Sequence, residues 1–158
     1  MTVVIDANVL LRLADTTAAL HPVTLSALSA LSALESQGHV LHTLPQSIYE
    51  FWVVASRPVR GNGLGLSAAE CDGAVVAIET MFPVIPDPPA LFVRWRALVV
   101  AHACHGKVAH DARYVAAMQA HGLTHLLTFN LADFTRFPGL SLLDPAVIAA
   151  GSSPGTTP

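Results

Sequence analysis

Residues 2–11 read TVVIDANVLL, an apolar run that contains one acidic and one amide side chain. The first four residues predict a short buried strand, and residues 7–14 predict a helix that follows it directly. Asp6 lies at the junction between the two. In open α/β sheets ligands bind at the carboxyl ends of the strands, so Asp6 occupies a position typical of a functional group. A helix cap is the alternative role for this side chain.

Helices and short apolar strands alternate along the rest of the chain. Further strands are expected at residues 39–43, 84–85, 126–128 and 140–143, and further helices at residues 22–37, 45–56, 68–82, 90–104, 111–121 and 131–136. This order predicts an α/β protein, a three-layer fold with a short, mostly parallel central sheet flanked by helices. We expect one domain over residues 1–147 and a disordered tail over residues 148–158, because the end of the chain is rich in Gly, Ser, Thr and Pro.

Composition indicates a protein with a partner. Of the 158 residues, 53% are hydrophobic and only 12% are charged, which is apolar for a monomer and favours a homodimer or a bound protein. Cys71 and Cys104 have no motif spacing, so neither a disulfide framework nor a zinc knuckle is expected. A reducing cytoplasm is the simplest location.

Charge and hydropathy exclude two classes of function. The net charge of −3, with seven Arg and one Lys, provides no basic stripe for tight sequence-independent binding to nucleic acid. The apolar stretch 91–103 contains Arg94 and Arg96, so we expect no membrane span there. No cleavable signal segment is expected either, because residues 1–6 lead directly into a strand without a basic start.

Three further acidic residues stand in apolar surroundings. Glu50 is the only charged residue between residues 45 and 56, and a buried carboxylate requires a cation or dense hydrogen bonding. A place on a solvated stripe is its alternative. Asp111 opens an expected helix and can act as its cap. Asn130 and Asp133 follow a strand at the same sheet edge as Asp6, although together they also match a variant capping box.

These segments resemble, in their order and separation, PIN-domain ribonucleases of the kind found as VapC toxins of bacterial toxin–antitoxin pairs. The resemblance covers about residues 2–145. It rests on VVIDANVLL at residues 3–11, IYEF at 48–51, VAHDARYVA at 108–116 and LTFNLADF at 127–134. The Arg57-Pro58 turn and residues 62–67 are also similar to a toxin subgroup.

The resemblance implies a metal-dependent endoribonuclease, in which Asp6, Glu50 and Asp111 hold Mg²⁺ or Mn²⁺ and a metal-activated water cleaves RNA. Many relatives have Asp where this chain has Asn130, so the fourth catalytic ligand is either Asn130 or Asp133. The resemblance also implies a small antitoxin protein as partner. Further expected contacts to the metal-bound water or to RNA phosphates are those of Asn8, Arg12, Lys107, Arg113 and Thr128.

Alternative functions differ in the chemistry they require. A catalytically weak or inactive PIN-like binding module stays open because of Asn130. Phosphotransfer through an aspartyl nucleophile calls for a second acid two residues after Asp6, where this chain has Asn8. The histidines His102, His105 and His110 permit a zinc site only as a minor alternative. The glycine-rich loop at 61–65 lacks the Lys and the spacing of a phosphate-binding loop.

Overall fold

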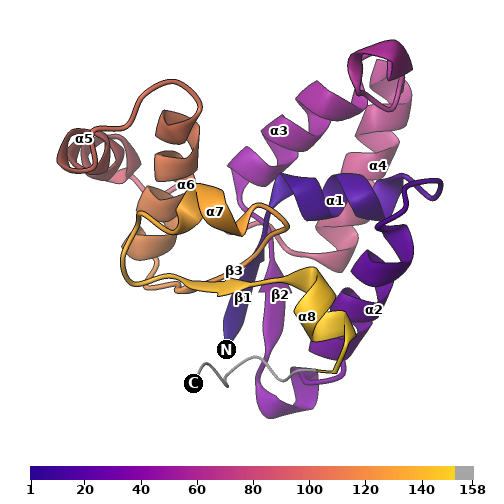
Figure 1. Ribbon diagram of the computed structural model, residues 1–158, viewed down its shortest axis with the longest axis horizontal. Coiled ribbons are helices and arrows are strands. Elements are labelled where there is room, and N and C mark those ends of the chain that lie inside the picture. Colours follow the sequence, from indigo (N-terminus) through magenta and orange to yellow (C-terminus); the bar gives the residue numbers. More distant parts are fainter. Residues whose placement is uncertain (152–158) are drawn as a thin grey trace.

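The computed structural model describes residues 1–151, and the ribbon in Figure 1 shows their arrangement. The expected tail therefore lies mostly outside the described residues. In chain order the elements are β1 (Thr2–Ile5), α1 (Ala7–Ala14), α2 (His21–Ser32), the 3₁₀ helix η1 (Glu35–Gln37), β2 (Val40–His42), α3 (Pro45–Ala55), the 3₁₀ helix η2 (Val59–Gly61), α4 (Ala68–Met81), α5 (Leu91–Ala101), α6 (Val108–Ala120), β3 (His125–Leu127), α7 (Leu131–Phe134), β4 (Ser141–Leu143) and α8 (Pro145–Ala149).

The sheet contains four strands in the order β2-β1-β3-β4, and every neighbouring pair is parallel. β1 is central, as expected of the most apolar strand, and its last residue Ile5 pairs with Leu127 of β3. This register places Asp6 beside Thr128, each directly after its strand. A backbone hydrogen bond from the Asp6 amide to the Leu127 carbonyl, 3.0 Å long, continues the pairing to this edge.

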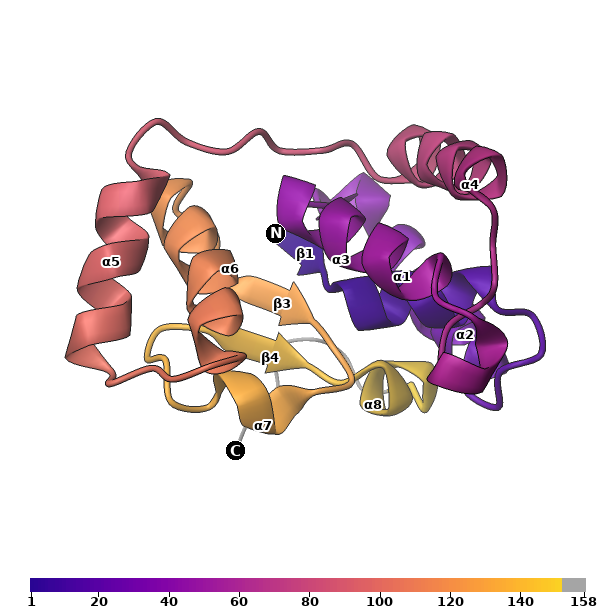
Figure 2. The same cartoon turned by 90° about the horizontal axis from the view of Figure 1, so that it is seen from above.

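Side chains of the sheet alternate between two apolar cores. Val3, Ile5 and Leu127 face a core shared with α1, α2, α3, α4 and α8, whereas Val4 and Leu126 face a core shared with α5, α6 and α7. Figure 2 shows the resulting three layers, with α5 and α6 on one side of the sheet and α1 to α4 on the other. The three-layer α/β fold and its parallel sheet are thus as the sequence predicted.

Several element boundaries differ from the expected ones. α6 begins at Val108, three residues earlier than predicted, so Asp111 lies inside the first turn and is not the helix cap. The predicted helix over residues 22–37 ends at Ser32 and is followed by η1, which Gly38 closes in the left-handed conformation with φ 78°. Ser67 and Glu70 form a capping box at the start of α4.

The C-terminal boundary also shifts. α8 was not predicted, and the domain boundary expected at residue 147 falls inside it. Asp144 caps this helix by accepting a hydrogen bond from the Ala146 amide, and Ile148 is buried in the core beside α2. Residues 148 and 149 therefore belong to the folded domain. Within residues 1–151, no helix combines the length and apolar character that spanning a bilayer requires.

Leu126 is fully buried in β3, between the sheet and α6. We expect Leu126→Ala to lower the free energy of unfolding by about 2–5 kcal/mol, because the change removes apolar contacts and leaves a cavity. Urea unfolding measures this loss. Val100→Ala on α5, at a side chain that is 75% exposed, is the matched control and should change stability by less than about 0.5 kcal/mol. Equal effects of the two substitutions would contradict the described core.

Candidate active site at the carboxyl edge of the sheet

Asp6 is buried at the centre of the carboxyl edge, with 5% of its surface exposed. It stands at the N-terminal cap position of α1, yet its side chain makes no capping hydrogen bond. Instead its Oδ2 atom accepts hydrogen bonds from Thr128 Oγ1 and Asn8 Nδ2, both 2.6 Å long. The cap alternative for this side chain is therefore not realised, and the carboxylate is held at the sheet edge.

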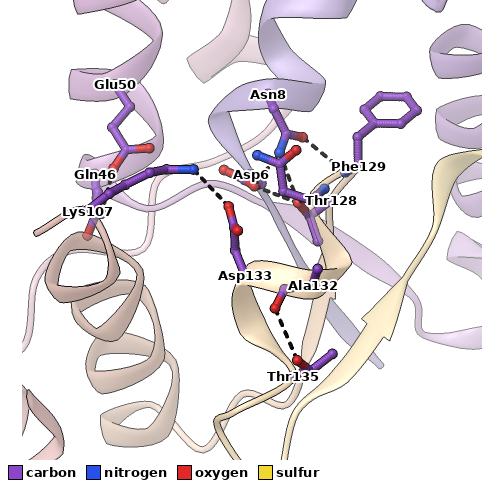
Figure 3. A network of polar contacts seen from close by, with 11 residues as sticks. Asp6, Asn8, Gln46, Glu50, Lys107, Thr128, Phe129, Ala132, Asp133 and Thr135 are labelled. Atoms are coloured by element: carbon purple, nitrogen blue, oxygen red, sulfur yellow. Dashed lines mark hydrogen bonds and ion pairs between the residues drawn. The ribbon is translucent and has the colours of Figure 1, made fainter. Parts of the chain in front are cut away.

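Asn8 and Thr128 join the two central strands around this carboxylate (Figure 3). Asn8 Nδ2 also donates to Thr128 Oγ1 at 2.9 Å, while Asn8 Oδ1 accepts the Phe129 amide at 3.2 Å. Thr128 Oγ1 additionally accepts the Asn130 amide at 3.0 Å. Both side chains use their hydrogen-bonding groups within the protein, so they act by orienting Asp6. Their expected contacts with a metal-bound water or with RNA phosphates stay a prediction.

Glu50 reaches the edge from the second turn of α3 and is half-buried. Its Oε1 accepts a 2.7 Å hydrogen bond from Gln46 Nε2, which lies one helical turn earlier on the same face. Gln46 itself is 4% exposed and also donates to the His110 carbonyl. Arg113 Nη1 donates to Gln46 Oε1, which fixes the orientation of the amide so that its nitrogen faces Glu50.

Asp111 enters the same space from the first turn of α6 and is 7% exposed. Within residues 1–151 no hydrogen bond reaches its carboxylate. Burial raises the pKa of Asp111 to about 6; the nearby Lys107 ammonium opposes this shift, and the charges of three other acids increase it. A carboxylate that is largely removed from water and surrounded by other acids is stabilised by a nearby cation.

Asp133 belongs to α7 and is only partly buried, with 38% of its side chain exposed. Its Oδ2 accepts a hydrogen bond from Lys107 Nζ at 2.7 Å. The side chain of Asn130 makes no capping hydrogen bond to α7. The variant capping box considered for these two residues is therefore wrong, and Asp133 is directed toward the other acids (Figure 3).

Asp6, Glu50, Asp111 and Asp133, called the acidic cluster below, influence one another electrostatically. Burial raises the pKa of Asp6 from 3.8 to about 6, the hydrogen bond from Thr128 opposes the shift, and the charge of Glu50 adds to it. Tyr114, fully buried behind Asp6, has a pKa well above its ordinary value because of burial and the charges of Asp6 and Glu50. The cluster therefore carries excess negative charge in a poorly hydrated place.

The acids do not form a ready metal cage. In the part of the chain that the structure describes, no three His, Cys, Asp or Glu side chains are arranged so that they could hold one metal ion together. The acids expected to converge thus share one edge of the sheet and influence one another electrostatically, but the described side chains do not form the expected metal site. Carboxylates are nevertheless the oxygen ligands that Mg²⁺ and Mn²⁺ prefer, so the chemistry of the donor set fits such an ion.

Arg12 and Arg113, which were expected to contact RNA phosphates, interact with other residues of the protein. Arg12 is exposed in the last turn of α1, where its charge lowers the pKa of Asp15 after the stronger effect of Thr17. Arg113 forms an ion pair with Asp87 and supports Gln46, so its guanidinium is committed to positioning Glu50. Contact of either residue with RNA stays a prediction.

Three buried residues that support the acids were missed by the sequence analysis: Gln46, Ser47 and Tyr114. Ser47 Oγ donates to the Ile5 carbonyl at 2.8 Å and thereby fixes the start of α3 to the end of β1. Tyr114 accepts the Ala7 amide at 3.3 Å. Only Gln46 had a visible signal, since it precedes Glu50 by four residues on a predicted helix.

Comparison with solved structures identifies the fold. No protein-family model and no curated protein matches the sequence. Solved structures match over most of the chain. VapBC2 from Rickettsia felis bound to a promoter DNA fragment has a TM-score of 0.66 at 14% identity, covering 90% of this chain and 98% of that one. VapBC-1 from nontypeable Haemophilus influenzae has a TM-score of 0.64 at 14% identity, covering 92% and 98%.

A third similar structure is VapC20 of Mycobacterium tuberculosis, a sarcin–ricin loop cleaving toxin, with a TM-score of 0.54 at 16% identity over 96% of this chain and 97% of that one. The fold is that of a VapC-type PIN domain. This finding confirms the fold that the sequence motifs predicted. At such low identities the likeness carries the fold alone, and the role of each residue depends on the geometry described above.

The raised pKa of Asp6 makes the stability of the metal-free protein depend on pH. Because the folded chain holds this proton up to about pH 6 and the unfolded chain only to about 3.8, unfolding becomes easier as pH rises between these values. The loss attributable to Asp6 should be about 2–3 kcal/mol. We expect Asp6→Asn, compared with the wild type by urea unfolding in EDTA at pH 4.5 and 7, to show a smaller fall. Identical falls in both proteins would contradict the burial of the Asp6 carboxylate.

Proposed function

We propose that this protein is a metal-dependent endoribonuclease that hydrolyses RNA phosphodiester bonds, and that it is the toxin of a toxin–antitoxin pair. The observation that carries the proposal is the acidic cluster at the carboxyl edge of the parallel sheet, where Asp6 and Asp111 are buried with raised pKa values. Such an excess of negative charge calls for a divalent cation. The VapC-type fold supports the same function by analogy.

Asp6, Glu50 and Asp111 are the proposed ligands, with Asp133 or Asn130 at the fourth position. A divalent ion bound there would supply Lewis acidity toward the phosphate and a more acidic water. The residues around the ligands hold them in position, since Thr128 and Asn8 orient the Asp6 carboxylate and Gln46 orients that of Glu50. Glu50 and Asp111 would have to turn further inward, because the described side chains do not yet converge.

A groove beside the acidic cluster is the proposed place for the RNA and for an antitoxin segment. Its volume is about 720 Å³. Glu50 and Lys107 lie in the groove next to apolar side chains of α3, of which Tyr49 is 60% and Val53 is 52% exposed. A partner segment with apolar side chains and a basic group would cover both kinds of surface. Two of the similar structures are VapBC complexes, which agrees with a protein partner of this kind.

A binding module without catalytic activity is the second candidate. It is favoured by the open arrangement of the acids and by the Lys107–Asp133 ion pair within them. Cleavage of RNA by the purified protein separates the two candidates directly.

We expect the purified protein to cleave structured RNA in the presence of Mg²⁺ or Mn²⁺ and to lose this activity in EDTA. Asp6→Asn should lower the rate at least about 100-fold, because losing one charged ligand removes several kcal/mol of transition-state stabilisation. Gel analysis of a labelled RNA measures both effects. Glu79→Gln on the exposed face of α4 is the matched control and should cleave as the wild type does. Equal cleavage by wild type and Asp6→Asn would refute the nuclease.

The groove makes a separate prediction about the antitoxin. Val53→Glu places a charge on its apolar wall, so binding of a cognate antitoxin should weaken by about tenfold or more. The new carboxylate lies one helical turn from Glu50 in the groove that is also proposed for the RNA, so metal-dependent cleavage should slow as well. Titration calorimetry and the cleavage assay measure the two properties. Unchanged antitoxin affinity would show that the partner binds elsewhere.

A further inference from the structure

We propose that the ammonium group of Lys107 is a built-in counter-cation of the acidic cluster, and that it competes with the divalent ion for this place. Lys107 is thus a positioning residue that sets the metal affinity of the site. The inference deepens the proposed function and rests on it, since it presupposes that the cluster binds a metal.

The position of Lys107 supports this role. It is the only lysine of the chain and stands directly before the first residue of α6. Its side chain extends from there toward the acids, where Nζ donates to Asp133 Oδ2 at 2.7 Å. In Figure 3 the ammonium lies between the carboxylates of Glu50 and Asp133 and points toward Asp6. It therefore lies where negative charge from three elements of the fold meets.

Electrostatics shows that Lys107 acts on more than its hydrogen-bond partner. The pKa of Lys107 is raised first by the Asp133 hydrogen bond, and the charges of Asp111 and Asp6 add to this. In return Lys107 has the largest charge effect on Asp111, whose pKa it lowers against the effect of burial. The ammonium thus partly neutralises the acids and replaces some of the attraction that a cation would supply.

The Lys107 side chain can leave this place. It is 69% exposed and stands on a flexible four-carbon stem, so it can swing into solvent when its attraction to the acids is lost. A divalent ion at the cluster brings twice the charge and several oxygen ligands, and it repels the ammonium. Binding of the ion and the inward position of Lys107 therefore oppose each other, which weakens the apparent metal affinity.

Mn²⁺ titration calorimetry of the metal-free protein at pH 7.5 tests the proposal. We expect Lys107→Met to bind Mn²⁺ about tenfold more tightly than the wild type, since the variant lacks one positive charge close to the ion. Lys107→Arg keeps the charge and should bind more weakly than Lys107→Met. Arg60→Met, at an exposed residue of η2, makes the same change in net charge far from the acids and should match the wild type.

Thermal unfolding gives a second readout that a purely structural role would not produce. In EDTA, Lys107→Met should melt at a lower temperature than the wild type, because the acids lose their counter-cation. In saturating Mg²⁺ this difference should vanish or reverse. A deficit that persists unchanged in Mg²⁺, or Mn²⁺ affinity equal to or weaker than that of the wild type, would overturn the role of Lys107 while leaving the metal centre intact. Absence of Mn²⁺ binding in all four proteins would overturn the proposed metal centre as well.

Discussion

Burial of the Asp6 carboxylate beside other acids is the constraint on which the arrangement of the sheet edge depends. The pairing of Ile5 with Leu127 brings Thr128 next to Asp6, and the two hydrogen bonds at 2.6 Å fix one carboxylate oxygen. A charge removed from water in this way needs such donors, and it stays expensive when further acids approach. The raised pKa of Asp6 expresses this cost.

The surrounding helices maintain this electrostatic repulsion, and Lys107 relieves it only in part. Ser47 fixes the first turn of α3 to β1, which brings Glu50 to the edge one turn later. α6 starts early enough for Asp111 to lie inside its first turn, where it is buried. Lys107 provides positive charge close by, through its ion pair with Asp133. An enzyme gains from this arrangement if the unfavourable energy is recovered when a divalent ion and a phosphate bind.

The fold and the candidate residues could be predicted from the sequence to different extents. Apolar runs ending at Asp6 and Thr128 indicated parallel strands whose carboxyl ends meet, so these two side chains were expected together. Hydrogen-bond partners that lie far apart in the chain could not be recognised from the sequence in this way. The hydrogen bond from Arg113 to Gln46 joins residues 67 positions apart, and neither residue type predicts this pairing. Arg113 was therefore expected to contact RNA, although in the structure it forms an ion pair with Asp87 and a hydrogen bond with Gln46.

Element ends were the least predictable part for a similar reason. A capping role was the alternative for Asp111 because local propensity favours Asp at that position, but α6 begins at Val108, so Asp111 lies inside the helix. α8 was missed because its five residues have a weak pattern of their own, and burial of Ile148 against α2 stabilises it. Whether the acids converge depends on side-chain rotation around a bound ion, which no sequence pattern encodes.

The most direct test of a metal-dependent nuclease centre is an anomalous difference map from crystals of this protein grown with Mn²⁺. We expect one strong peak in contact with the carboxylates of Asp6, Glu50 and Asp111, with Lys107 turned away from it. A map without a peak at this edge at saturating Mn²⁺, with Lys107 still paired to Asp133, would contradict this expectation.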